Sequence, residues 1–152
     1  MNVSTCTDEQ FKIYKTQWAQ KIREIELPKD MNSSIGQMIL SQLDECYAYL
    51  RIDLSEIEAA KERTDSIIRQ NERSKAEGRN EIDRKKNATE YLENYPIDEE
   101  GGSVDMYEWN RLLMTRYAII RGFVEVINNK QQRLITMSGF LKIDSNLGNG
   151  MH

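Results

Sequence analysis

The stretch that decides the fold is residues 105–133, DMYEWNRLLMTRYAIIRGFVEVINNKQQR. Its apolar residues recur mostly three or four positions apart, which is the period of an amphipathic helix. The main stripe comprises Tyr107, Trp109, Leu113, Tyr117, Ile120, Val124 and Ile127. Leu112, Ile119 and Phe123 lie beside the stripe and widen it, so we expect this helix to be the most buried in the molecule.

A first helix is predicted before this stretch, over roughly 8–26. Thr7 and Gln10 have the spacing of a capping box. The apolar residues that follow keep helical spacing: Phe11, Tyr14, Trp18, Ile22 and Ile25. Pro28 cannot continue the ladder of helical hydrogen bonds, so the helix should end by that point.

A second helix is predicted over 34–77, with Ser33 or Ser34 as its N-terminal cap. Its apolar positions run from Ile35 to Ile68, and no proline or glycine interrupts them before Gly78. A continuous helix of this length would extend about 65 Å at 1.5 Å per residue. The alternative is a break near residues 53–55, where an Asp and a Ser could cap a new helix.

The region between the two long segments is more polar. Residues 81–95 predict a shorter helix with Ile82, Ala88, Tyr91 and Leu92 on one side. Residues 96–105, PIDEEGGSVD, have the composition of a loop. Asp105 or Ser103 should cap the helix of 105–133, and a hydrophobic segment follows at 134–143. No alternation indicates a β-strand.

The whole composition is typical of a helical protein: 152 residues, 30% charged, with two prolines and eight glycines. We expect an all-α fold of long antiparallel helices in a hairpin or bundle. The sparse stripe of 35–68 cannot cover the wide apolar arc of the last helix, which predicts a homo-oligomer. The expected organisation is an N-terminal helix at 1–30, a helical core domain at 31–145 and a flexible tail at 146–152.

The residues used most often in catalysis are scarce. His152 is the single histidine, Cys6 and Cys46 lack the CxxC spacing, and no phosphate-binding glycine loop is found. We therefore expect no enzyme, no metal site and no cofactor. The chain also shows neither a membrane span nor a secretion signal, which favours the cytoplasm.

Local charge is more informative than the total of −4. Residues 61–86 contain nine basic and six acidic side chains, a net charge of +3 that leaves −7 for the rest of the chain. The candidate nucleic-acid-binding residues are Lys61, Arg63, Arg69, Arg73, Lys75, Arg79, Arg84, Lys85 and Lys86. Such side chains would contact phosphates without reading sequence. Tyr91 and Tyr95, nearest in sequence, could stack on unpaired bases.

A mixed-charge segment is more often only the solvated face of a helix, and that interpretation stays open. Against it, Glu77 and Glu81 are four residues apart, which places like charges together rather than in ion pairs. Trp18, Trp109, Tyr117 and Phe123 occur on apolar stripes and are expected in the core.

Three segments together resemble the phage UvsY family of recombination mediators: CYAYL at 46–50, LSEIEAAKER at 54–63, and YAIIRGFVEVINNKQQRLITM at 117–137. The resemblance covers residues 28–143 and implies an all-helical protein that assembles into a ring. It also implies binding to single-stranded DNA and loading of a RecA-like recombinase onto strands covered by a single-stranded DNA-binding protein. The implied assembly surface comprises Tyr117, Ile120, Phe123, Val124, Ile127 and Leu134.

The first hypothesis is thus a non-enzymatic recombination mediator, in a bacterial host cell if a phage encodes it. The alternative is a coiled-coil structural or adaptor protein, such as a phage could encode, that assembles without touching DNA. In a variant of that alternative the chain inhibits a host protein, with its acidic face docked on a basic site.

Overall fold

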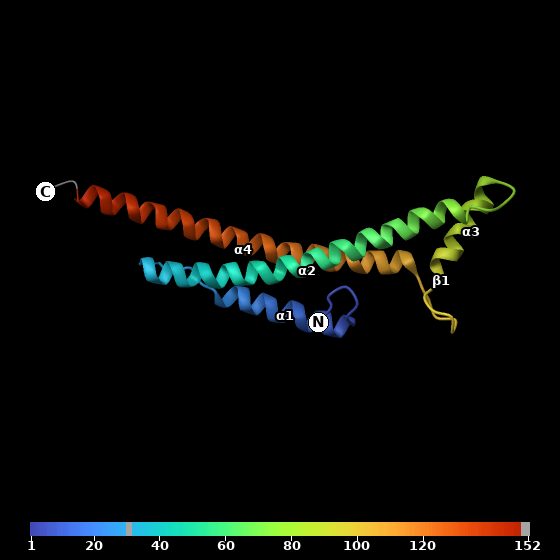
Figure 1. The fold of residues 1–152 in the computed structure, drawn as a ribbon, viewed down its shortest axis with the longest axis horizontal. Coiled ribbons are helices and arrows are strands. Elements are labelled where there is room, and N and C mark those ends of the chain that lie inside the picture. Colours follow the sequence, from blue (N-terminus) through green and yellow to red (C-terminus); the bar gives the residue numbers. More distant parts are fainter. Residues whose placement is uncertain (30–31, 150–152) are drawn as a thin grey trace. The chain divides into compact units, whose positions relative to one another are not determined.

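The computed structural model describes residues 1–29 and 32–149, with side chains for residues 1–29 and 32–139. The elements in chain order are α1 (Asp8–Glu24), α2 (Ser33–Ser74), α3 (Glu81–Glu93), β1 (Tyr95–Pro96), β2 (Ser103–Val104) and α4 (Met106–Asn149) (Figure 1). The prediction of an all-α fold is confirmed. Of the expected tail, 146–149 continue α4 and 150–152 lie outside the described residues.

Helix α1 begins with the predicted capping box. The backbone N–H of Gln10 donates to Thr7 Oγ1 over 3.2 Å, and the backbone N–H of Thr7 donates to Gln10 Oε1 over 2.9 Å. The helix ends at Glu24, two residues before the expected position. Phe11, Tyr14 and Ile22 are its buried residues, which agrees with the apolar pattern.

Helix α2 is continuous over 42 residues, so the alternative break near 53–55 is absent. The predicted serine cap is wrong: Asn32 Oδ1 accepts the backbone N–H of Ile35 over 2.8 Å, and Ser33 and Ser34 are helical. No helix breaker occurs near residue 53, and Leu54 and Ile57 are buried on either side of Ser55. A single apolar stripe therefore passes through this region without a change of phase.

The turn between α2 and α3 depends on Gly78. Its φ of +154° is a conformation that other residues rarely adopt, and a Cβ there would lie 2.8 Å from the Cβ of Asp83. Asn80 then caps α3 by accepting the backbone N–H of Asp83 over 2.9 Å. Ala88 and Leu92 are buried as predicted, but Ile82 is 79% exposed. Six residues separate Ile82 from Ala88, which places them on different sides of a helix.

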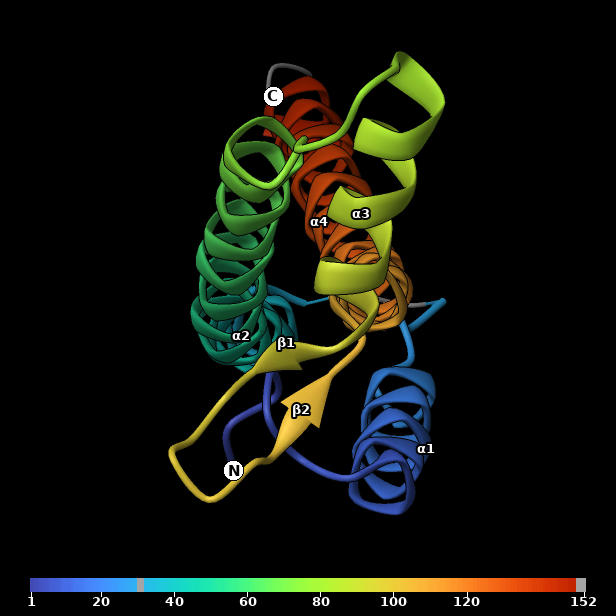
Figure 2. The ribbon, with the colours of Figure 1, turned by 90° about the vertical axis from the view of Figure 1, so that its right-hand side faces the viewer.

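The expected loop at 96–105 contains a β-hairpin that the sequence did not indicate. β1 and β2 pair antiparallel, with Tyr95 opposite Val104 and Pro96 opposite Ser103. Figure 2 shows the two short arrows leading from α3 into α4. Asp105 caps α4, as predicted, through the backbone N–H groups of Tyr107 and Glu108 at 2.9 and 3.1 Å. The helix continues through 134–143, the segment expected to follow it.

The chain forms two compact units, and both long helices belong partly to each. Unit 1 comprises Met1–Thr5 and Ser55–Ala118, and unit 2 comprises Cys6–Leu54 and Ile119–His152. The division predicted from the sequence stays a prediction, and its boundary between residues 30 and 31 lies outside the described residues.

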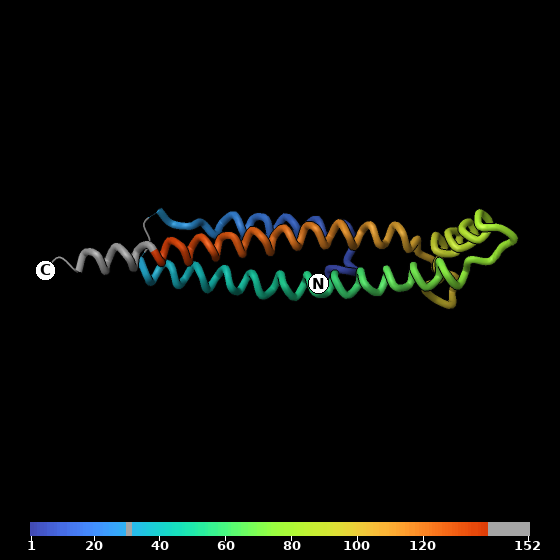
Figure 3. Tube along the Cα trace, turned by 90° about the horizontal axis from the view of Figure 1, so that it is seen from above, coloured from blue at the N-terminus to red at the C-terminus, as the bar shows by residue number. Residues whose placement is uncertain are grey.

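Unit 2 is a three-helix arrangement of α1, the first part of α2 and the later part of α4, which lie side by side in Figures 1 and 3. Polar contacts join each pair of helices. Tyr14 donates to Asp53 over 2.6 Å, and Gln131 donates to Asp44 over 2.6 Å. Lys130 Nζ donates to the backbone carbonyls of Ile22 and Ile25 at 3.0 and 2.5 Å, and so caps the C-terminal end of α1. The core includes Ile22, Leu43, Cys46, Leu50, Ile120, Ile127 and Leu134.

Candidate nucleic-acid interface

An apolar cluster in unit 1 positions the basic segment. Ile68 of α2, Leu92 of α3 and Met106 of α4 are buried together. Partly buried side chains pack against them: Ile67, Tyr91, Tyr95, Val104 and Tyr107. The cluster fixes the inward side of α2, and the opposite side of the same helix faces solvent.

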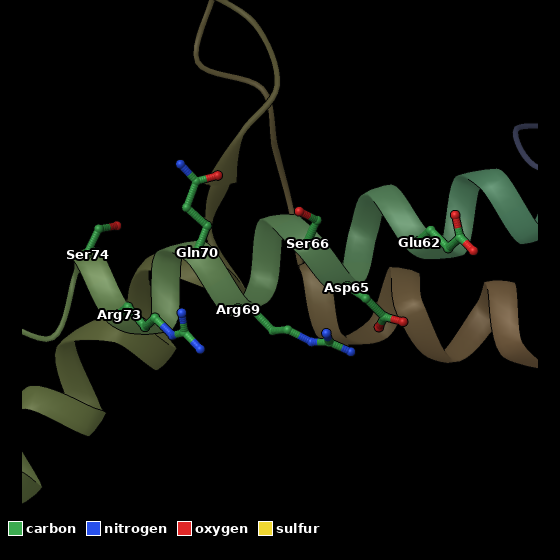
Figure 4. Close-up of a pocket in the computed structure, with 7 residues that line it drawn as sticks. All are labelled: Glu62, Asp65, Ser66, Arg69, Gln70, Arg73 and Ser74. Carbon is green, nitrogen blue, oxygen red and sulfur yellow. The ribbon is translucent and has the colours of Figure 1, made fainter.

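Arg69 and Arg73 lie on that solvent side, one helical turn apart. Both are exposed, and they line a groove together with Glu62, Asp65, Ser66, Gln70 and Ser74. In Figure 4 the two guanidinium groups extend to the same side of α2, whereas Ser66, Gln70 and Ser74 project to the other side. Neither arginine forms a hydrogen bond or ion pair with any described residue.

Two acids that neighbour these arginines in sequence, Asp65 and Glu72, form side-chain contacts with α4, and Glu62 lines the same groove. Asp65 accepts the side-chain amide of Asn110 over 3.0 Å and pairs with Lys61 at 3.7 Å. Glu72 accepts the hydroxyl of Tyr107 over 3.1 Å. Burial, followed by this bond to Glu72, raises the pKa of Tyr107 above its ordinary value. The phenol therefore stays protonated and holds Glu72 in place.

Four of the nine candidate residues have partners within unit 1. Besides Lys61 with Asp65, Lys86 pairs with Glu90 at 3.7 Å. Arg84 Nε donates to the backbone carbonyl of Gly78 over 3.1 Å. The Lys75 ammonium lies 4.7 Å from the centre of the Tyr91 ring. Arg63, Arg69, Arg73, Arg79 and Lys85 are exposed, without a hydrogen bond or ion pair to the described residues.

The two tyrosines proposed as stacking platforms are already packed. Tyr91 and Tyr95 meet edge to face, with ring centres 5.9 Å apart and planes at 84°. Both contact the apolar cluster, and Lys75 covers Tyr91. A nucleobase could stack on Tyr91 only after Lys75 moved away. The other aromatics placed in the core, Trp18, Trp109, Tyr117 and Phe123, are half-buried.

Most of the residues suggested for subunit contacts are used within one chain. Ile120, Val124, Ile127 and Leu134 are buried, and Tyr117 and Phe123 are half-buried. The wide stripe of α4 is covered in unit 2 by α1 and α2 together, whereas the prediction from sequence took only α2 into account. The homo-oligomer stays a prediction, and a contact between subunits in this region would need exposed side chains such as Val126 and Ile135.

Two features of unit 1 were missed at the sequence level. Ser66, Gln70 and Ser74 line the same groove as the arginines, and their spacing of four residues from one another could have indicated that they share a side of α2. Arg116 is buried to 1% exposure, although the apolar stripe predicted from the sequence omits it. It lies three residues after Leu113 and four before Ile120, on the core face, which was an available signal.

The described residues contain no group of three or more His, Cys, Asp or Glu side chains able to hold a metal ion. Within the same residues, no helix combines the length and apolarity needed to cross a lipid bilayer.

Burial raises the pKa of the Cys46 thiol, so this cysteine is protonated and unreactive in the folded chain.

Comparison of the chain with models of protein families, with characterised proteins and with solved structures found no match. The resemblance to the UvsY family therefore stays a prediction, and the functional argument depends on the geometry of unit 1.

Proposed function

We propose that the chain is a non-enzymatic recombination mediator that binds single-stranded DNA without sequence preference. One observation carries the proposal: Arg69 and Arg73 extend side by side into solvent, while the neighbouring acids Asp65 and Glu72 are bound to α4. Guanidinium groups held this way can each donate to a phosphate oxygen. Arg63, Arg79 and Lys85 add exposed positive charge in the same unit.

The wider role follows from the resemblance described above. In this role the chain acts as a homo-oligomer in the cytoplasm of a bacterial host. It loads a RecA-like recombinase onto DNA covered by a single-stranded DNA-binding protein. Phosphate contacts of this kind release counterions, so the binding should weaken steeply with salt.

The test is fluorescence anisotropy of a labelled oligo-dT strand at several salt concentrations. Reversing two charges in Arg69→Glu/Arg73→Glu should weaken binding at least about tenfold and lower the salt slope by about 0.7 for each phosphate that is no longer neutralised. The matched control is Lys15→Glu/Arg23→Glu, which changes the same charge at exposed positions of α1. Equal losses of affinity in the two double variants, or binding that salt does not affect, would contradict the proposal.

A second candidate function is a coiled-coil structural or adaptor protein, including one that inhibits a host protein. The observation that favours it is the length of α2 and α4, 42 and 44 residues, with exposed Met38, Tyr49 and Ile52 on α2. This function predicts no DNA binding and no effect of Arg69→Glu/Arg73→Glu on assembly. Sedimentation of the wild-type chain and the double variant, with and without oligo-dT, separates the two functions.

A further inference from the structure

The first five residues form a small docked module in unit 1. Val3 and Ser4 are 0% and 4% exposed, which is unusual for a short segment outside any helix. The residues that receive them lie on two helices: Glu56 on α2 and Arg116 on α4. We call these two residues and the space that holds Val3 the seat.

The bonds between the module and the seat are mostly to backbone atoms. Arg116 Nη1 donates to the carbonyls of Val3 and Ser4 at 3.0 and 3.3 Å. Glu56 Oε1 accepts the backbone N–H of Ser4 over 3.1 Å. The seat thus supplies a charged donor and a charged acceptor, and the Val3 side chain supplies the apolar contact.

The module also carries its own internal bonds. Asn2 Oδ1 accepts the backbone N–H of Ser4 at 3.0 Å, the hydroxyl of Ser4 at 2.7 Å and the backbone N–H of Thr5 at 3.0 Å. This Asx-type turn is local and does not need the seat. A segment that keeps its shape when released loses little entropy on docking again.

An empty seat would be costly because Arg116 is almost completely buried. Loss of the module would remove two of the oxygen atoms that accept from its guanidinium group, and a buried charge that loses acceptors is strongly destabilising. The seat should therefore bind a peptide that offers two backbone carbonyls to Arg116 and an apolar side chain in the place of Val3.

We propose that the seat is a docking site for the N-terminal module of a second copy of the chain. Residues 1–5 belong to unit 1, whereas the next segment, Cys6–Leu54, belongs to unit 2, and Cys6 and Thr7 between the module and α1 are not helical. A change at these two residues can transfer the module to another molecule while every bond to the seat is retained. The inference is independent of nucleic-acid binding.

Complementation between two variants tests the proposal. Val3→Glu places a charge on the buried side chain, so that chain has an intact seat and a module that cannot dock. Arg116→Met has an intact module and a defective seat. In sedimentation, neither variant alone should gain mass by exchange of the module, whereas their equimolar mixture should form a species of twice the mass of the separate variants as the concentration rises from micromolar to about millimolar.

Thr5→Glu is the matched control because Thr5 is exposed and its module stays docked. A mixture of Thr5→Glu with Arg116→Met should show no such gain in mass. The proposal is overturned if the Val3→Glu mixture is no heavier than this control. Circular dichroism establishes that each variant keeps its helices.

If Arg116→Met does not fold, a synthetic peptide of residues 1–7 with Cys6→Ser replaces it. In NMR titrations the peptide should shift resonances around Glu56 and Arg116 in Val3→Glu and leave the wild-type spectrum unchanged. No shifts in Val3→Glu at millimolar peptide would equally overturn the proposal.

Discussion

Tyr107 of α4 bonds to Glu72 of α2, and this contact should make the stability of the chain depend on pH. Burial, with the bond to Glu72 as the next cause, raises its pKa above the ordinary value of 10.0. A group whose pKa is higher in the folded chain gives stability that is fully present below the unfolded pKa and is lost as pH rises through the folded one. We therefore expect the contribution of Tyr107 to decline only above about pH 10.

The measurement is urea unfolding of the wild-type chain and Tyr107→Phe at pH 8 and pH 11. The wild-type chain should be the more stable at pH 8, and its advantage should shrink at pH 11. Because other groups also titrate in this range, the difference between the two proteins is the relevant quantity. An advantage that stays constant or grows with pH would contradict the assignment.

At the residue scale, sequence patterns predicted what depends on neighbours in the chain. The capping box of Thr7 and Gln10 and the cap at Asp105 were predicted because a cap needs only the next three residues. The acceptors of Arg116 and Lys130 could not be assigned, since they lie more than a hundred residues away in sequence. The contacts of Asp65 with Asn110 and of Glu72 with Tyr107 could not be assigned either, because they join residues 45 and 35 positions apart in sequence.

At the scale of the element, the end of α1 gives a second stability prediction. Lys130 of α4 donates to the last carbonyls of α1, where a positive charge also interacts favourably with the helix dipole. Lys130→Met should destabilise the chain by about 1.5–3 kcal/mol, the usual range for hydrogen bonds to charged groups. Chemical denaturation measures the change.

Arg133→Met is the control for Lys130→Met, because Arg133 lies one turn later on α4 and is exposed. It should change the free energy of unfolding by less than about 0.5 kcal/mol. If both substitutions cost the same, the cap at α1 contributes nothing specific.

The errors at this scale have physical causes. The hairpin was missed because its strands contain two residues each, too few for alternation to be visible. Helix α2 stayed unbroken at residues 53–55 because Leu54 and Ile57 continue one buried stripe, and tertiary packing outweighs the local capping preference of Asp and Ser.

At the scale of the whole molecule, the two units share two helices, and this should make unfolding cooperative. The division between units falls at Leu54–Ser55 in α2 and at Ala118–Ile119 in α4, in the interior of each helix. Fraying a helix from such an interior point requires a new helix end with unsatisfied backbone groups. We therefore predict one thermal transition for the chain, with equal calorimetric and van't Hoff enthalpies.

Substitutions in each unit test this prediction. Leu92→Ala in unit 1 and Leu43→Ala in unit 2 each empty a fully buried site and should cost about 2–5 kcal/mol. For a chain of this size the single midpoint should fall by roughly 5–15 °C in both variants. Ile82→Ala, at an exposed position of α3, should leave it nearly unchanged. Two resolved transitions, of which each variant moves only one, would show that the units unfold independently despite their shared helices.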